Sequence, residues 1–542
     1  MTVATTTAGS MSAPLGLELL TVEVRLMSNA KALRLARVVA GCALAAMFLA
    51  HLGMLTFVDP DLWHEMALAR ELIAAGAMPL VDEYAYTPTV QPVVHHEWGT
   101  GVVLYAVSML GGSTALMTLK YALSFGTAIL CCAAARRRGA SWEVLFSVAP
   151  LTILSGIIGF TTVRAQLFTL FFVALLMYDL ACADDANDSS AATRSSSQAS
   201  RSTWLRWLKW LPLYVAWLNL HAGFVVGVGI LALYGCERLC RRQPVGLLLA
   251  VGFTLVGLVA INPYGVEYYP YLYRALTMPR PLVTEWQPLW TAEPTMFRLY
   301  LASVLLVLYA VPKLGVRQMP GLLILAVCAL LAAKHTRHLS IYLVVWLSLT
   351  PAYLERTRLG SSLRMAWAKR CRWIAVAGAL ILGFSGTQAA LSRPWELDIP
   401  TGDADAHLGR PVYPVGAVAY LRENQVRGNL FTPFVPGGYC LYQLHPAMKV
   451  SLDGRYEVAY APGVLEENVA FYAAKSGWRE TLDKYPTDYV LVPRSAPIAE
   501  PLKKLSDWQP IYTDAMFILF ARAGSNFPRL ERAEAPTTTA FP

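Results

Sequence analysis

Residues 35–57 read LARVVAGCALAAMFLAHLGMLTF, and residues 58–76 read VDPDLWHEMALARELIAAG. The first stretch has the length of about 20 apolar residues that a helix needs to cross a bilayer. Similar stretches recur along the chain: hydrophobic residues make up 56% of its 542 positions and charged residues only 15%. Soluble globular proteins carry about a quarter charged residues. The sequence therefore predicts an α-helical polytopic membrane protein and excludes a disordered chain or a disulfide-rich secreted scaffold.

About eleven apolar segments can be laid out as transmembrane helices. They lie near residues 35–57, 114–135, 141–160, 165–183, 207–220, 222–240, 245–261, 297–312, 318–334, 338–354 and 373–391. Residues 98–112 are apolar but too short to cross, so we expect an interfacial helix lying against the outer leaflet. Residues 184–203 are poor in apolar side chains and predict a disordered cytoplasmic linker.

The net charge of +9 comes from basic clusters in the short segments between the apolar stretches. All of these clusters fall on one side of the predicted membrane, which is typical of cytoplasmic loops and gives no reason to expect a nucleic-acid partner. The clusters are Lys31, Arg34 and Arg37; Arg136, Arg137 and Arg138; Arg238, Arg241 and Arg242; Lys313 and Arg317; and six residues between Arg356 and Arg372. This orientation predicts a cytoplasmic segment 1–34 and a transmembrane module 35–391 with outer loops 58–113 and 262–296.

The polar C-terminal region, residues 392–542, has the size and composition of an α/β domain on the outer side of the membrane. Short apolar runs predict buried strands, and segments with helical spacing predict helices between them. The strands are expected at Val490–Pro493 and Met516–Ala521, the helices at Gly416–Glu423 and Gly463–Ala474, and tight turns at Gly437–Tyr439 and Asp453–Arg455.

The first outer loop carries acids next to histidines. Asp59 followed by Pro60 has the pattern of a helix N-cap with proline at the first helical position. Asp61 then lies in the first turn, with His64 and Glu65 three and four residues on, on nearly the same face. A carboxylate at this place could deprotonate a hydroxyl or bind a cation. For Asp59 the capping role is the stronger interpretation, and for Asp61 the chemical one.

A second cluster, His95-His96-Glu97, directly precedes the expected interfacial helix. Glu97 is therefore a candidate second carboxylate. His-His-Glu could ligate a metal, although contiguous residues rarely point at one ion. A divalent cation therefore stays open as a cofactor, and no metal ligands are assigned.

Further polar residues interrupt the apolar stretches on the same side as the acidic loop, where each is costly in lipid. Arg164 and Arg337 could grip a phosphate by forked hydrogen bonds, or their side chains could extend to the lipid head groups. The second outer loop adds an acid among aromatic residues. Together these positions predict an outer cavity whose candidate substrate-binding residues are His64, His96, Arg164, His221, Glu285, Arg337 and His338.

Several short motifs resemble those of the GT-C glycosyltransferases, in particular the bacterial relatives of protein O-mannosyltransferases and aminoarabinose transferases. An opening span is followed by an outward Asp61 with Ala69-Arg70 eight residues on. The other motifs also resemble a set of bacterial GT-C-like membrane proteins. They are DPDLWHE (59–65), HHEWG (95–99), TTVRAQ (161–166), WLNLHAGF (217–224), INPYG (261–265), KHTRH (334–338), PGGY (436–439) and SLDGRYE (451–457).

The resemblance implies a helical bundle with a soluble periplasmic domain in a bacterial inner membrane. It implies a polyprenyl-phosphate-sugar donor and a glycan, lipid or protein acceptor, with Asp61 as catalytic base, Glu97 as second acid and Arg337 as a ligand of the donor phosphate. Many relatives carry an acid directly after the aspartate, where this chain has Leu62. The choice of base between Asp59 and Asp61 therefore stays open. The alternatives are a lipid-linked sugar transporter or flippase and a non-catalytic envelope scaffold.

Overall fold

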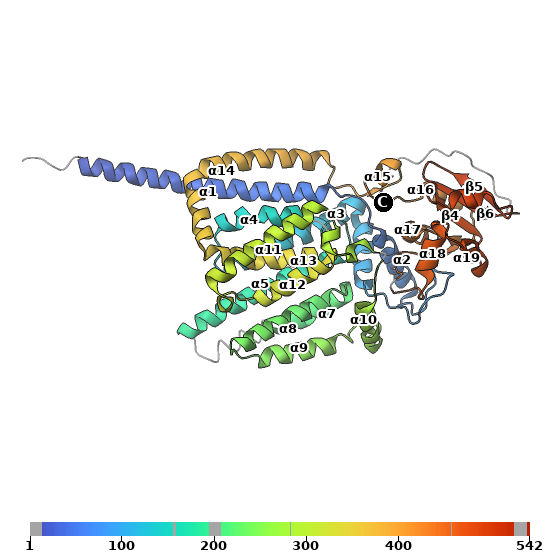
Figure 1. The fold of residues 1–542 in the computed structure, drawn as a ribbon, viewed down its shortest axis with the longest axis horizontal. Helices are drawn as coiled ribbons and strands as arrows, with labels where there is room; N and C mark the ends of the chain where they lie inside the picture. Colours follow the sequence, from blue (N-terminus) through green and yellow to red (C-terminus); the bar gives the residue numbers. More distant parts are fainter. Residues whose placement is uncertain are drawn as a thin grey trace, which may run out of the picture.

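The structure is a computed structural model that describes residues 14–155, 159–193, 207–281, 283–456, 458–524 and 539–541. A long helical bundle carries an α/β domain at one end (Figure 1). We call this end of the bundle the domain end. Most of the expected segment 1–34 is the beginning of helix α1, but residues 1–13 of it lie outside the described residues, as do residues 194–203 of the expected linker.

Each of the eleven apolar segments contains a helix. The helices are α1 (Pro14–Gly53), α3 (Trp98–Arg137), α4 (Trp142–Ser155), α5 (Gln166–Thr193), α7 (Trp210–Leu220), α8 (Phe224–Cys240), α9 (Gly246–Leu258), α11 (Pro294–Leu314), α12 (Leu322–Lys334), α13 (Leu339–Glu355) and α14 (Arg358–Leu391). Among the described residues, five helical stretches are long and apolar enough to cross a membrane: Ala30–Gly53, Trp98–Arg137, Gln166–Asp184, Pro294–Leu314 and Arg358–Leu391. The count of eleven spans is therefore not confirmed. A helix of 13 residues such as α9 is only about 20 Å long, against about 30 Å of hydrocarbon.

Helix α3 contains the break that the sequence predicts ahead of its span. Gly111 and Gly112 leave the helical conformation, and Gly112 has a φ of 53°, which favours glycine. Residues 98–110 thus form a separate first arm of α3. Its position against the outer leaflet stays a prediction.

The expected disorder of residues 184–193 is wrong, because α5 continues through them to Thr193. Asp184, the first residue of this segment, is fixed by neighbouring helices. It accepts hydrogen bonds from Tyr234 Oη at 2.8 Å and from Arg138 Nη2 at 3.4 Å. These contacts fix Asp184, where the polar part of α5 begins.

The C-terminal domain contains a five-stranded sheet in the order β3-β2-β4-β6-β5. Strands β3, β2 and β4 are parallel, whereas β6 is antiparallel to both β4 and β5. The strands are β2 (Gly428–Phe431), β3 (Met448–Val450), β4 (Tyr489–Pro493), β5 (Trp508–Thr513) and β6 (Phe517–Arg522), while β1 (Asp398–Ile399) pairs separately with β7 (Thr539–Ala540). The helices are α15 (Asp403–His407), α16 (Val415–Glu423), α17 (Phe434–Leu444), α18 (Val464–Tyr472), α19 (Trp478–Lys484) and α20 (Ala499–Lys503). The expected α/β character is thus confirmed. The two expected strands and two expected helices are also present, with each end within two residues of its expected position.

One expected turn is wrong. Residues Gly437–Tyr439 lie inside α17, and their glycines allow close packing instead of a turn. A Cβ on Gly437 would come within 2.0 Å of the Leu452 carbonyl oxygen, and one on Gly438 within 3.2 Å of the Pro60 carbonyl oxygen. The expected turn at Asp453–Arg455 is present, with the Arg455 amide donating to Asp453 Oδ1 at 2.9 Å.

The C-terminal domain is fastened to the first loop by a buried ion network. The Arg455 guanidinium donates to both oxygens of Asp453 at 2.9 and 2.7 Å and also to Asp82 of the first loop. Tyr460 Oη donates to Asp453 at 2.6 Å. The side chains of all three charged residues are at most 2% exposed. Helix α2 (Pro60–Ala75) is thus held between the bundle and the domain.

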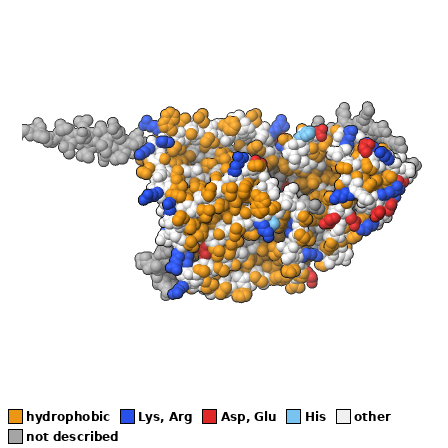
Figure 2. All heavy atoms as spheres, in the orientation of Figure 1, with side chains coloured by type: hydrophobic (Ala, Val, Ile, Leu, Met, Phe, Trp, Pro, Cys, Tyr) orange, Lys and Arg blue, Asp and Glu red, His pale blue; other side chains and the backbone are white. Residues whose placement is uncertain are grey.

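The basic clusters gather at the end of the bundle opposite the C-terminal domain, which we call the basic end. Figure 2 shows blue side chains at this end and a broad hydrophobic band between it and the domain. This arrangement is what the positive-inside rule expects of a membrane protein with a cytoplasmic basic end.

The predicted orientation can be tested with two exposed positions, Gln243 near the basic end and Ser476 in the C-terminal domain. In a cysteine-free background, we expect Ser476→Cys to react with an impermeant thiol reagent in intact spheroplasts. Gln243→Cys should react only after the membrane is opened. The reverse pattern would overturn the orientation.

Candidate functional site

A cavity of about 380 Å³ lies at the domain end, between α2, the start of α3 and the C-terminal domain. This size falls within the range of small-ligand pockets. Residues from seven separate stretches of the chain line it, including η3 (Thr284–Trp286) and the 3-10 turn η6 (Thr336–His338). The predicted site residues that line it are Asp59, Asp61, His64, His96, Glu97, Arg164, Glu285 and Arg337.

Arg164 contacts three of the acidic side chains. It lies in the loop before α5 and donates to Asp61 Oδ2 at 2.7 Å through Nη2 and to Glu285 Oε1 at 3.1 Å through Nη1. Its Nε lies 3.6 Å from Asp59 Oδ2. The guanidinium therefore contacts three carboxylates. Its expected contact with a phosphate stays a prediction.

Asp59 and Asp61 differ in how far their carboxylates are occupied. Asp59 caps α2 by accepting from the Asp61 amide at 3.0 Å, and its other oxygen accepts from Thr162 Oγ1 at 2.5 Å. The Asp61 side chain is 29% exposed, against 8% for that of Asp59. The Asp61 Oδ1 atom faces Gly454, and a Cβ added to Gly454 would lie 3.2 Å from this oxygen. Both aspartates line the cavity, and Asp61 is the more exposed of the two.

The surroundings of Asp61 make it a better base than an exposed aspartate. Burial raises the pKa of the Asp61 carboxyl, and Arg164 partly opposes this. The negative charges of Glu97 and Glu285 raise the pKa further. A carboxylate with a raised pKa binds a proton from a hydroxyl more readily at neutral pH.

Glu97 is held by two histidines from different parts of the chain. Its Oε1 lies 3.3 Å from His96 Nε2 and 3.2 Å from His221 Nε2. Burial opposes ionisation, but the charge of His96 and the hydrogen bonds from His221 and His96 lower the pKa of Glu97 well below its ordinary value. Glu97 is therefore ionised at neutral pH.

The protonation of His221 follows from its other partners. Its Nδ1 accepts from the Gly223 amide at 3.0 Å and lies 2.7 Å from Thr169 Oγ1, which itself accepts from Trp217 Nε1 at 2.8 Å. An accepting Nδ1 leaves the proton on Nε2, which faces Glu97. His221 thus reaches the site through Glu97 and is not itself among the residues that line the cavity.

Glu65 lines the same cavity and was not assigned a role from the sequence, although it lies four residues after Asp61. It is 3% exposed, and its two oxygens accept no hydrogen bond from the described residues. Burial raises the pKa of Glu65 well above its ordinary value, and the charge of Glu97 adds to this. These directions favour a protonated Glu65 beside an ionised Glu97. The i, i+4 spacing was the only sequence signal for Glu65.

Arg337 presents the uncommitted positive charge of the site. Its guanidinium lies 4.6 Å from the centre of the Trp286 ring, and none of the salt bridges found among the described residues involves it. Although burial opposes this, the charges of Arg164 and Arg337 lower the pKa of Glu285. Arg280 lies over the Trp286 ring at 4.4 Å. His338 also packs near Trp286, with ring centres 6.0 Å apart, and does not line the cavity.

A divalent cation, left open by the sequence, stays a prediction, and the positions of the candidate ligands are as follows. Within the part of the chain that the structure describes, no three His, Cys, Asp or Glu side chains are grouped to hold a metal. His95 is buried, whereas His96 stacks on Tyr271 at 5.6 Å. The position between Asp61 and Glu285 is already filled by the Arg164 guanidinium.

Comparison with known proteins gives a match of fold. No family model and no curated protein matches the sequence. An Archaeoglobus fulgidus oligosaccharyltransferase tethered to an acceptor peptide superposes with a TM-score of 0.53 at 11% identity, over 90% of this chain and 74% of that one. The chain has a GT-C fold.

Two further GT-C structures show weaker likeness. ArnT from Cupriavidus metallidurans bound to undecaprenyl phosphate gives a TM-score of 0.47 at 14% identity, over 90% of this chain and 98% of that one. The A. fulgidus oligosaccharyltransferase AglB in complex with an inhibitory peptide and a dolichol-phosphate gives 0.48 at 10% identity, over 86% and 70%.

Proposed function

We propose that the chain is a GT-C-type glycosyltransferase of a bacterial inner membrane. It transfers a sugar from a polyprenyl-phosphate-linked donor to a glycan, lipid or protein acceptor on the periplasmic face. The observation that carries the proposal is the cavity at the domain end, where Asp61 is accessible and Arg337 is uncommitted. The GT-C fold supports it.

In the proposed reaction, the acceptor hydroxyl attacks the anomeric carbon of the donor sugar. The hydroxyl proton moves to the Asp61 carboxylate as the new C–O bond forms. The bond between the anomeric carbon and the phosphate oxygen breaks, and polyprenyl phosphate leaves with the electron pair of that bond. Arg337 stabilises the phosphate by charge and by forked hydrogen bonds. Glu97, which is ionised, accepts hydrogen bonds from sugar or acceptor hydroxyls.

A purely structural role for this site is disfavoured by its energetics. Buried carboxylates are costly unless they are paired, and a bundle needs none for stability. Here Asp59, Asp61 and Glu285 share a single arginine, while Glu65 is buried beside the charge of Glu97. A non-catalytic scaffold has no use for this arrangement.

The proposal is tested with purified protein in nanodiscs. A panel of polyprenyl-phosphate sugars is supplied with membrane glycolipids and envelope glycans as acceptors, and the release of polyprenyl phosphate is measured. We expect acceptor-dependent release with at least one donor. Release by none of the donors, by a protein that binds polyprenyl phosphate, would contradict the transferase assignment.

A further prediction concerns Arg337. Arg337→Gln should weaken the binding of polyprenyl phosphate by about tenfold or more, because a hydrogen bond to a charged group contributes about 1.5–3 kcal/mol. Arg337→Lys keeps the charge but loses the fork, so it should raise KM for the donor more than it lowers kcat.

The matched control is Arg298→Gln, an exposed arginine at the start of α11 that does not line the cavity. Binding is measured by titrating polyprenyl phosphate into protein in detergent. Equal losses in the Arg337 and Arg298 variants would show that the effect is one of general surface charge.

A further inference from the structure

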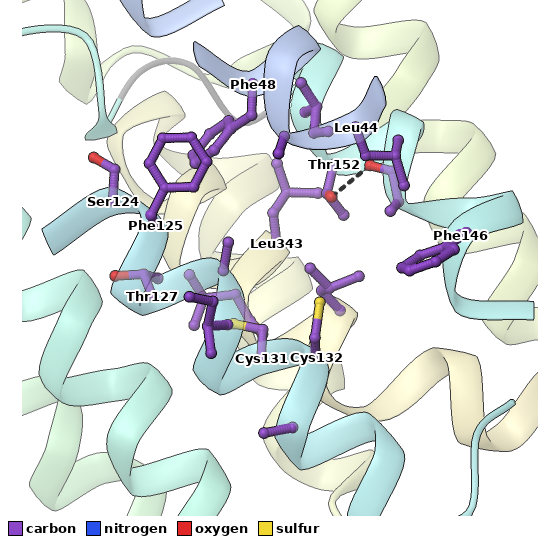
Figure 3. A pocket seen from close by; sticks show the side chains of 18 of the residues that line it. Leu44, Phe48, Ser124, Phe125, Thr127, Cys131, Cys132, Phe146, Thr152 and Leu343 are labelled. Carbon is purple, nitrogen blue, oxygen red and sulfur yellow. Dashed lines mark hydrogen bonds between the residues drawn. The ribbon is translucent and has the colours of Figure 1, made fainter. Parts of the chain in front are cut away.

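A second and larger cavity, of about 680 Å³, lies within the bundle between α1, α3, α4 and α13. Figure 3 shows side chains of these helices around it, among them Leu44, Phe48, Phe146 and Leu343. None of its lining residues lines the site cavity. It is therefore a separate feature of the fold.

The wall of this cavity offers almost no polar group to a ligand. Thr127 Oγ1 donates to the Leu123 carbonyl at 2.8 Å, and Thr152 Oγ1 donates to the Ala149 carbonyl at 2.7 Å. Both hydroxyls are thus satisfied within their own helices. The Cys131 thiol donates to the Val344 carbonyl at 3.5 Å. Ser124 Oγ, where the α3 lining begins, is buried and finds no hydrogen-bond partner among the described residues. Most of the remaining wall is hydrocarbon, which suits an alkyl chain.

The charged groups that line the cavity lie at its basic end. Arg136 and Arg137 line this end and are exposed, and the Arg136 guanidinium lies 4.9 Å from the centre of the Trp142 ring. The side opening is marked by Ile129 and Trp142, which are 65% and 38% exposed. A positively charged mouth therefore leads into an apolar interior.

The length of the cavity matches a lipid chain that starts at the basic end. Its lining residues on α3 run from Ser124 to Arg137, which corresponds to about 20 Å at 1.5 Å per residue. One leaflet of hydrocarbon is about 15 Å thick, half of a bilayer core of about 30 Å. A chain anchored at Arg136 and Arg137 would fill the cavity over slightly more than one leaflet.

We propose that this cavity holds one acyl chain of an anionic membrane phospholipid, with its head group at Arg136 and Arg137. Basic pockets between transmembrane helices on the cytoplasmic side bind anionic head groups in this way. The proposal is independent of the transferase reaction. The phosphate of the proposed donor belongs beside Arg337 at the domain end, whereas the charges of this cavity lie at the opposite end.

Native mass spectrometry of the full chain in detergent tests the proposal, with phosphatidylglycerol and phosphatidylcholine titrated separately. We expect one phosphatidylglycerol to bind at least tenfold more tightly than phosphatidylcholine. The double variant Arg136→Gln/Arg137→Gln should remove this preference, since each basic residue near the head group contributes about 1 kcal/mol. Ala45→Phe, which fills the cavity from an exposed position on α1, should weaken the binding of both lipids.

The matched control is Arg241→Gln/Arg242→Gln, a pair that follows α8 at the basic end and does not line the cavity. It should leave the preference for phosphatidylglycerol unchanged, and thermal unfolding should show that each variant is folded. Equal binding of the two phospholipids, or an equal loss in the control pair, would overturn the proposal. Displacement of phosphatidylglycerol by polyprenyl phosphate in wild type but not in Ala45→Phe would also overturn it and assign the cavity to the donor.

Discussion

Asp61→Asn is expected to lower sugar transfer by about 10²–10⁴-fold, the usual contribution of a positioned general base. The substitution keeps the size of the side chain and removes its basicity. Arg164 retains Glu285 and Asp59 as partners, so the protein should stay folded. The measurement is the initial rate of polyprenyl phosphate release, with thermal unfolding recorded in parallel.

Asp59→Asn is the matched control two residues away. Asn caps a helix about as well as Asp, and the Oδ1 that accepts from the Asp61 amide is kept. We expect only a small loss of rate. The opposite result, an inactive Asp59→Asn and an active Asp61→Asn, would move the base to Asp59. Full activity of both variants would exclude the proposed mechanism.

The pH dependence of transfer gives a second measure of the same group. Because burial raises the pKa of Asp61, the rate should fall on acidification at a pH above the range near 3.9 that is usual for aspartate. Glu285→Gln removes a negative charge that raises this pKa, so the fall should move to lower pH. If the fall in rate at low pH (the acid limb of the pH profile) does not move in Glu285→Gln, a group other than Asp61 controls it.

The helices were predictable because a segment inside a bilayer must satisfy its backbone hydrogen bonds internally, which leaves long apolar runs in the sequence. Hydropathy does not report which neighbour covers a helix. Residues 339–354 of α13 are all buried by the protein, although their composition resembles that of a lipid-facing span. This is one reason why the number of spans could not be derived from composition alone.

The acidic loop was predictable because its signals are local. The cap at Asp59 and the spacing of Asp61, His64 and Glu65 follow from the helix period. The role of Arg164 was not predictable, since its partners lie about 100 residues before it and 121 residues after it. The sequence placed Arg164 correctly on the side of the acidic loop but could not distinguish a phosphate ligand from a counter-ion.

Burial was the other missing information. Glu65 looks like an ordinary solvent-facing acid on an amphipathic helix, yet the packing of α2 against α3 encloses it. A Cβ on Gly101 would come within 2.4 Å of the Glu65 carbonyl oxygen, so the two helices approach closely there. The glycines of PGGY likewise allow another segment to pack closely. The sequence could not show this, because close approach and a tight turn both select glycine. Only the three-dimensional contacts separate the two.

Arg164→Gln is expected to have the largest effect on stability. It would leave Asp59, Asp61 and Glu285 without their shared counter-ion in a site where the arginine side chain is 21% exposed. Removing one partner of a buried ion pair costs about 3–5 kcal/mol. It should also raise the pKa of Asp61, because Arg164 is the main group that lowers it. We therefore expect a lower unfolding temperature and an acid limb of the rate that moves toward neutral pH.

Two comparisons separate this counter-ion role from phosphate binding. Arg164→Lys keeps the charge but loses the planar fork that reaches three carboxylates. Its unfolding temperature and the position of its acid limb should therefore lie between those of wild type and Arg164→Gln. In Asp61→Asn/Arg164→Gln the loss of stability should be smaller than the sum of the two single losses, because the uncompensated carboxylate at residue 61 is gone. Arg298→Gln should change neither measurement. If Arg164→Gln instead keeps its unfolding temperature and loses only affinity for polyprenyl phosphate, then Arg164 binds the donor, as the sequence alone suggested, and Arg337 is not its sole phosphate ligand.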